Sequence, residues 1–295
     1  MRKATKGENL GEVKISQKQG KKLGLKGKTP ISPGLGKCCL RLCAKSSYQQ
    51  AEEDLKTLMG INVGHSTLHR LVQRVELPSA QATNKTSTVS VDGGKICLRS
   101  EETGLGEWRD YKLVNLHGEV CEAFFQDPDA LEKWSETQPL DWLITCLGDG
   151  HPGVWNVFES LGKKRPIMKR EVLDWFHLME NLHKVGGSGQ RLARVKNFFW
   201  HGGVDKAMAG FDALNNKLAR NFQNYLSLHR HRIPCYHQYR QLGITIGLGS
   251  VESKIKQVAA RVKLSGARWK RDNVQRILRL RCAYLNNSSL LSISA

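Results

Sequence analysis

Residues 31–78 show the apolar spacing of helices. An apolar stripe predicts a helix over residues 48–59, with Gly60 as its stop, and a second helix over about residues 66–75. Two short helices joined by a glycine-containing turn are typical of a helix-turn-helix. An ordinary helical hairpin produces the same pattern. If the motif binds DNA, the predicted contacts are the polar face of its second helix: Thr67, His69, Arg70, Gln73 and Arg74.

The spacing changes from helical to alternating after a polar linker at residues 79–87. Residues 88–91 alternate and end at Asp92-Gly93-Gly94, after which a second strand is predicted to return. The compact apolar run at 142–147 suits a buried central strand and is followed by Gly148 and Asp149. The remaining predictions are strands at 95–99, 111–116, 120–125 and 171–173, helices at 129–137 and 154–161, and helical structure from about 176 to 239.

Three acids stand at informative places in this pattern. If the first strand and the buried strand lie side by side and parallel, Asp92 and Asp149 emerge at one sheet edge, where ligands of α/β sheets bind. Glu252 opens a further helix, with Ser250 as its predicted cap. Ordinary explanations exist for each: Asp-Gly-Gly is a common hairpin turn, Gly-Asp-Gly a common loop, and a first-turn Glu favours the helix dipole. The pattern alone leaves both readings open.

The charge distribution favours a polyanionic partner. The chain of 295 residues has a net charge of +19, of which residues 1–45 carry +10 and residues 254–281 carry +9. Two such patches are expected for nucleic-acid binding, although a solvated or ribosome-associated basic surface is an alternative. Trp269 could stack on a distorted base, but core packing is favoured for it. The predicted phosphate-gripping cations are Lys254, Lys256, Arg261, Lys263, Arg268, Lys270 and Arg271.

Other chemistry is weakly signalled. The eight cysteines show neither a CxxC pair nor an even disulfide framework, and the lysine-rich start lacks the apolar core of a secretory signal. No apolar run approaches the roughly 20 residues of a membrane span, so a cytosolic protein is expected. A weaker zinc hypothesis rests on four potential ligands within nine residues: His229, His231, Cys235 and His237.

Seven stretches resemble, in order, blocks of the DDE transposases of bacterial insertion sequences, in particular the Kra-type group. They are ISPGLGKCCLRLCAKSSYQQAEEDL, VSVDGGKICLR, TCLGDGHPGVWN, LDWFHLMENLHKVGGS, LHRHRI, GSVESKIKQ and SGARWKRDNV with RCAYLN, and they run from about Ile31 to Asn286. The resemblance implies an RNase H-like fold with Asp92, Asp149 and Glu252 as catalytic and metal-binding acids. Leu248 departs from the family pattern, which has a small polar residue there.

The resemblance also implies a role for a second motif. Asp174 and His177 match an Asp/Cys-x-x-His motif, for which a structural and a DNA-contacting role are equally open. The 57 and 103 residues that separate the three acids match a helical insertion in the second gap.

The implied mechanism needs two Mg²⁺ ions, or Mn²⁺ in their place, roughly 4 Å apart. Asp92 is expected to bridge both ions, with Asp149 on one and Glu252 on the other. Water cuts the strand, and the freed 3′-hydroxyl attacks target DNA without a covalent enzyme–DNA intermediate. The implied partners are double-stranded DNA, as terminal inverted repeats and target, and a second copy of the chain in a homodimer or larger assembly. The implied location is the cytoplasm, on the nucleoid.

Two rival functions remain open. One is a catalytically inactive or truncated transposase remnant that acts only as a DNA-binding protein. The other is a structure-specific nuclease unconnected with transposition.

The predicted fold class is α/β: an RNase H-like mixed sheet flanked by helices, with a helical insertion and an N-terminal helix-turn-helix. The predicted organisation is a basic flexible arm at 1–30, a helix-turn-helix region at 31–78, a linker at 79–87, the first part of the catalytic domain at 88–176, a helical insertion at 177–243, a C-terminal catalytic helix region at 244–286 and a tail at 287–295.

Overall fold

The computed structural model describes residues 16–22, 31–100, 106–214 and 216–292. The chain divides into two compact units. The first comprises residues 1–80, 95–110 and 256–295, and the second comprises 81–94 and 111–255. The fold class is α/β, as predicted, with a five-stranded mixed sheet flanked by helices. That architecture is compatible with an RNase H-like fold.

The described part of the first unit is mainly helical, with strand residues at 95–99 and 106–110. Helices α2 (Pro33–Lys45), α3 (Tyr48–Met59) and α4 (His65–Arg74) pack against one another, and α13 (Arg271–Leu285) packs on α2 and α4. The Ser47 hydroxyl accepts from the Gln50 N–H and caps α3, and Gly60 ends it in a left-handed conformation with φ 65°.

Both helices predicted between residues 48 and 75 are therefore present. Three packed helices do not by themselves show a helix-turn-helix, and that assignment stays a prediction. A short helix, α1 (Gln17–Lys22), lies in the segment predicted to be a flexible arm; the rest of that arm lies outside the described residues.

The sheet has the strand order β3-β2-β1-β4-β5. Its strands are β1 (Thr86–Arg99), β2 (Gly106–Leu116), β3 (Cys121–Phe124), β4 (Leu140–Gly148) and β5 (Met168–Leu173). Strands β2 and β3 are antiparallel, whereas β1 with β4 and β4 with β5 are parallel. The condition stated for Asp92 and Asp149, that the first strand and the buried strand lie side by side and parallel, is met.

One prediction about the sheet is wrong. Residues 88–91 and 95–99 are not two strands joined by a turn at Asp92-Gly93-Gly94, because β1 continues through all of them. The glycine at 94 serves packing instead: a Cβ there would collide with the ring of Tyr111 on β2. A glycine pair is a common turn signal, but in this strand Gly94 leaves room for the large Tyr111 ring on the neighbouring strand.

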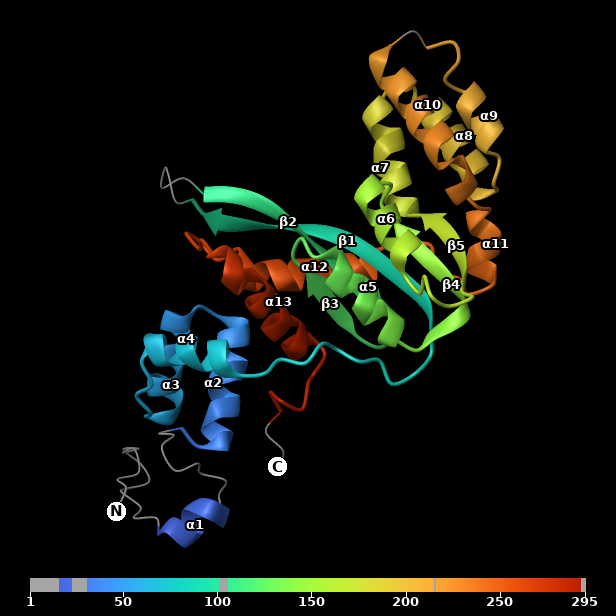
Figure 1. The fold of residues 1–295 in the computed structure, drawn as a ribbon. Helices are drawn as coiled ribbons and strands as arrows, with labels where there is room; N and C mark the ends of the chain where they lie inside the picture. Colours follow the sequence, from blue (N-terminus) through green and yellow to red (C-terminus); the bar gives the residue numbers. More distant parts are fainter. Residues whose placement is uncertain (1–15, 23–30, 101–105, 215, 293–295) are drawn as a thin grey trace. The chain divides into compact units, whose positions relative to one another are not determined.

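Helices complete the second unit. The sheet carries α5 (Pro128–Thr137) and α6 (Pro152–Ser160) between its strands. After β5 come the helices α7 (Trp175–Val185), α8 (Gly189–Trp200), α9 (Val204–Ala209), α10 (Lys217–His229), η1 (Arg230–Arg232), α11 (Tyr236–Gln241) and α12 (Gly249–Val262). In Figure 1, α7 to α10 gather into a bundle beyond the β4–β5 side of the sheet. This stretch is helical, as predicted. Of the described helices, none combines the length and apolar character that crossing a membrane requires.

Candidate metal centre

Asp92 and Asp149 each lie two residues beyond the last paired residues of two adjacent parallel strands. Those paired residues are Ser90 of β1 and Leu147 of β4. Asp149 follows the end of β4, as predicted. Asp92 lies inside β1 and not at its end, because β1 runs on beside β2 after its pairing with β4 has stopped.

Both carboxylates keep capacity for a ligand. Asp92 Oδ1 accepts a hydrogen bond from the Gly93 N–H at 2.6 Å, and Asp149 Oδ1 accepts from the His151 N–H at 2.8 Å. Both side chains are half-buried. A carboxylate has about four acceptor sites, so each acid retains oxygen lone pairs for a cation.

Glu252 belongs to the same electrostatic environment. It lies in the first turn of α12, as predicted, with its side chain 32% exposed. The pKa of Asp92 is raised, chiefly by burial and also by the negative charges of Asp149 and Glu252. The Gly93 hydrogen bond and the charge of His177 oppose the rise. A bound cation would relieve this repulsion between carboxylates.

Asp174 holds the segment that leads into the Glu252 helix. This fully buried side chain caps α7: Oδ2 accepts from the backbone N–H of His177 at 2.7 Å, and Oδ1 accepts from the Leu248 N–H at 2.7 Å. The Trp175 N–H donates to the Ile246 carbonyl at 3.0 Å in the same junction. These oxygens tie the start of α7 to the approach to α12, which favours the structural role for Asp174 over the DNA-contacting one.

His177 lies between two of these acids. Its Nδ1 is 2.8 Å from Asp174 Oδ2 and 3.9 Å from Glu252 Oε1. The hydrogen bond with Asp174 is the main reason that the pKa of His177 is raised to about 9. The imidazole therefore carries a positive charge at neutral pH and offsets part of the negative charge of the acids.

Asp174, His177 and Glu252 could together hold a metal ion. One potential ligand atom from each lies within 4.8 Å of the others. An ion there would have to displace the His177 proton and compete with the N–H donors that already occupy Asp174. Both requirements lower the metal affinity expected for this trio, even though its three potential ligand atoms lie close together.

Asp92, Asp149 and Glu252 are arranged more openly. In the part of the chain that the structure describes, no other set of three His, Cys, Asp or Glu ligand atoms comes within 4.8 Å, so these acids do not surround a single point. A two-ion site does not require that they do. With ions roughly 4 Å apart and Mg–O distances of about 2.1 Å, carboxylates on different ions stand several ångströms apart.

The zinc hypothesis for the segment 229–237 is not supported. Its four candidates do not form a ligand group of that size. His229 is buried with its Nδ1 3.2 Å from Arg232 Nη1, and the Cys235 thiol faces the Trp200 carbonyl. Burial lowers the pKa of His229 to about 4, so the ring is a neutral packing group.

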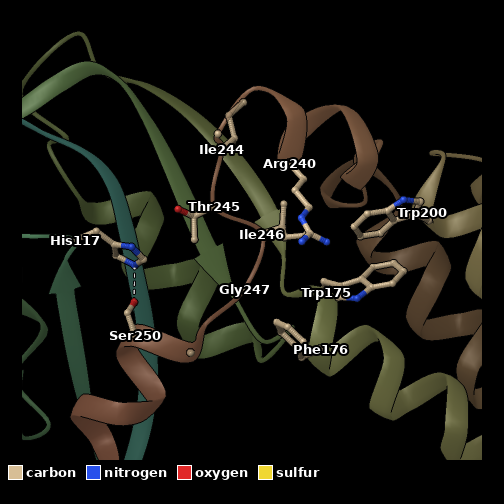
Figure 2. Close-up of a pocket in the computed structure, with 12 residues that line it drawn as sticks. His117, Trp175, Phe176, Trp200, Arg240, Ile244, Thr245, Ile246, Gly247 and Ser250 are labelled. Carbon is tan, nitrogen blue, oxygen red and sulfur yellow. Dashed lines mark hydrogen bonds between the residues drawn. The ribbon is translucent and has the colours of Figure 1, made fainter.

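His117, which was not predicted from the sequence, contacts the elements that carry Asp92 and Glu252. Its Nε2 lies 2.8 Å from Ser90 Oγ and 3.0 Å from Ser250 Oγ, and the second contact is drawn in Figure 2. Ser90 precedes Asp92 by two residues, and Ser250 precedes Glu252 by two. His117 therefore bridges β1 and α12 just before both acids. The prediction that Ser250 caps α12 is wrong, because Ser250 lies inside the helix and contacts His117 instead.

The predicted DNA-contacting residues differ in accessibility. The prediction that Arg261 contacts DNA is wrong, because its side chain is only 1% exposed. Its Nε donates to the Cys43 carbonyl at 2.7 Å, and its guanidinium lies over the rings of Tyr48 and Trp269. His69 and Gln73 are half-buried, and Gln73 donates to Asn273 Oδ1. Thr67 and Lys254 are half-exposed. The exposed members are Arg70, Arg74, Lys256, Lys263, Arg268, Lys270 and Arg271.

Comparison with known proteins adds no family assignment. No protein-family model matches this sequence, and no curated protein matches it either. The function is therefore argued from the geometry of the centre and from the motif resemblance.

Proposed function

We propose that this protein is a DDE transposase, which cuts and joins DNA strands at the ends of a bacterial insertion sequence and has an RNase H-like catalytic fold. The observation that carries the proposal is that Asp92 and Asp149 each follow, by two residues, the paired residues Ser90 and Leu147 of adjacent parallel strands, with Glu252 close enough to raise the pKa of Asp92. Three oxygen-donor acids and no cysteine in the group suit a hard divalent cation such as Mg²⁺.

The residues have distinct roles in this proposal. Asp92, Asp149 and Glu252 would hold two divalent ions through their carboxylate oxygens. Two bound Mg²⁺ or Mn²⁺ ions would supply a stronger nucleophile and stabilise charge on the leaving oxygen. Asp174 accepts from the Leu248 N–H just before α12, and His117 contacts the Ser90 and Ser250 hydroxyls, two residues before Asp92 and Glu252. The charged His177 ring would face the phosphate that approaches Glu252.

DNA binding would draw on exposed cations of the first unit. Arg70 and Arg74 are exposed on α4, the helix proposed to read the terminal repeat. Lys256, Lys270 and Arg271 would add phosphate contacts, which position DNA without reading its sequence. In this role the protein would act as a dimer or larger assembly on paired element ends.

A cleavage assay tests the proposal. Labelled terminal-repeat DNA is incubated with the protein and Mg²⁺ or Mn²⁺, and strand cutting is compared between the wild type and Asp92→Asn. The proposal predicts metal-dependent cutting that Asp92→Asn abolishes while DNA binding is retained. Binding without cleavage under either metal would favour an inactive DNA-binding remnant. Cutting of any branched DNA without preference for ends would favour a structure-specific nuclease.

A further inference from the structure

A cavity of about 670 Å³ lies in the second unit beside the candidate metal centre. The stretch 243–247 forms one side of it, and three aromatic rings, Trp175, Phe176 and Trp200, together with Arg240 form the other (Figure 2). A smaller hollow of about 440 Å³ shares Trp175, Trp200 and Arg240 with it and adds Lys196. The larger volume falls in the roughly 300–1,000 Å³ range of sites that bind small molecules or single groups of larger ones.

The aromatic walls are unequal. Trp175 is only 8% exposed and is held between Trp200, with ring centroids 5.0 Å apart, and Tyr236, at 4.9 Å. Phe176 is 60% exposed. Its ring passes close to Gly247, where an added Cβ would lie 2.7 Å from the Phe176 Cε2. The cavity thus has a rigid buried ring and, next to it, a large apolar ring in water with no described core function.

The cavity is adjacent to the acids in sequence and in space. Phe176 stands between Asp174 and His177, and the opposite end of the cavity reaches His117 and Ser250, two residues before Glu252. A group held in the cavity would therefore lie next to a phosphate bound at the centre.

The charge of the cavity is opposite to that of the centre it borders. Among the described residues that line the two hollows, Arg240 and Lys196 are exposed cations, and none is an aspartate or glutamate. Aromatic faces beside cations are the recognition chemistry of single-stranded nucleic acid, where bases stack on rings and cations contact the backbone. A purely apolar ligand would not need the cations, and an acidic ligand would not need the rings.

We propose that this cavity holds an unpaired nucleobase of the DNA strand next to the cut phosphate, stacked on Phe176, with Arg240 and Lys196 beside its backbone. The inference rests on the proposed function, because it names the part of the DNA substrate that the site recognises. Taking a base out of a duplex costs the free energy of its stacking and pairing. DNA that already carries an unpaired end avoids that cost and is the preferred ligand.

The test compares two DNA probes of one arbitrary sequence. The first is a blunt duplex, and the second is the same duplex with a short 3′ single-stranded overhang that contains 2-aminopurine. Binding is measured by anisotropy in Ca²⁺, and stacking by 2-aminopurine fluorescence. The wild type is expected to bind the overhang probe more tightly and to change its fluorescence. Phe176→Ala is expected to weaken overhang binding by about 5- to 100-fold, the range that one base–aromatic stack provides, and to leave blunt-duplex binding unchanged.

Two further variants serve as controls. Phe176→Tyr keeps the aromatic face and is expected to keep the preference for the overhang. Leu242→Ala removes an apolar side chain that is 73% exposed and does not line the cavity, so it is expected to behave as the wild type. Replacing the 2-aminopurine by an abasic site is expected to make the wild type and Phe176→Ala bind alike, because both then lack the stack.

Several outcomes overturn the inference. An equal loss on both probes, or a wild-type fluorescence identical to that of free DNA, would exclude a base in the cavity. A change in sedimentation of Phe176→Ala without any change in probe preference would assign the ring to contact with a second copy of the chain. Failure of the wild type to bind even the blunt duplex would reject the proposed function itself. Duplex binding and metal-dependent cutting without overhang preference would reject only the cavity proposal.

Discussion

Two buried arginines and one half-buried arginine of the first unit, and the carboxylates of the second unit, are both groups of charges, but they differ in where their hydrogen-bond partners come from. Arg261 donates to the Cys43 carbonyl, Arg281 to the carbonyls of Gln257 and Ala44, and Arg276 to those of Val72 and Val75. In each case the chain itself supplies the acceptor. Asp92 and Asp149 each have one backbone partner and otherwise face one another's charge.

The arginines therefore stabilise the fold, whereas the carboxylates retain the capacity to bind a cation. A buried cation that donates to backbone carbonyls of neighbouring helices ties those helices together, and its burial keeps it from contacting a phosphate. Half-exposed carboxylates that repel one another store an unfavourable interaction that a divalent cation removes. Net charge alone does not distinguish the two cases, because Arg261 counts toward the +19 while lying 1% exposed in the core.

The largest difference in activity is expected between two aspartates at opposite ends of β4. Asp149→Asn should reduce metal-dependent DNA cutting by on the order of a thousand-fold or more, because the ions supply several kcal/mol of transition-state stabilisation. Asp141→Asn is the matched control: it lies on β4 and its carboxylate also accepts from a backbone N–H, that of Trp142, but at the other end of the strand. Single-turnover cutting rates measure both. Equal losses for the two variants would remove Asp149 from the centre.

Loss of the His117 bridge is expected to have a smaller effect on activity than loss of Asp149. His117→Ala should lower metal-dependent activity or metal affinity by about 10- to 100-fold, the usual effect of losing a group that orients metal ligands. The concentration of Mn²⁺ that gives half-maximal cutting should rise, which a loss of folded protein alone would not cause. His201→Ala, an exposed histidine outside the centre, is the control. An unchanged Mn²⁺ requirement in His117→Ala would contradict the bridging role.

Two cations of the first unit should respond in opposite ways. Arg261→Met is expected to lower the free energy of unfolding by about 2–3 kcal/mol, because the Cys43 carbonyl loses a charged donor. Lys256→Ala, an exposed side chain, should change stability by no more than roughly 0.5 kcal/mol and should reduce the salt dependence of DNA binding by about one phosphate contact. Urea unfolding and salt titrations measure the two effects. A lower salt slope in folded Arg261→Met would contradict the assignment of Arg261 to the core.

The smallest expected effect depends on pH. Glu119 accepts hydrogen bonds from the side chains and backbone N–H groups of Asn84 and Thr83, chiefly from Asn84, and its pKa is lowered from 4.5 to about 2. The stability that its charge contributes is therefore complete above pH 4.5 and is lost as the pH falls toward 2. Glu119→Gln should be less stable than the wild type at pH 7, and the difference should shrink across that window. A difference that grows on acidification would contradict this sign.

Parts of the fold could be predicted from the sequence because they depend on neighbours along the chain. The helix at 48–59 has its cap, apolar stripe and glycine stop within a dozen residues, and its observed limits agree. The buried strand β4 was predictable from the compact apolar run before Asp149. The prediction of a turn at Gly93-Gly94 was wrong for the opposite reason. The ring that Gly94 accommodates, that of Tyr111, lies on another strand, and no local sequence pattern indicates this contact.

The same limit explains what was missed in the site. Ser90, His117 and Ser250 are each unremarkable in sequence, and only the fold brings them together. Arg261 was placed among DNA contacts because it lies in a basic run, while its burial depends on packing against α2 and α3. The serines at position −2 before Asp92 and Glu252 were the one available hint.

The most direct test of the account is the location of bound metal. A crystal of the protein grown with Mn²⁺ and measured for anomalous scattering should show density between Asp92 and Asp149, extending toward Glu252, and the density should be lost from the Asp92→Asn variant. Density confined to the trio of Asp174, His177 and Glu252, with none beside Asp92, would contradict the assignment of the catalytic centre.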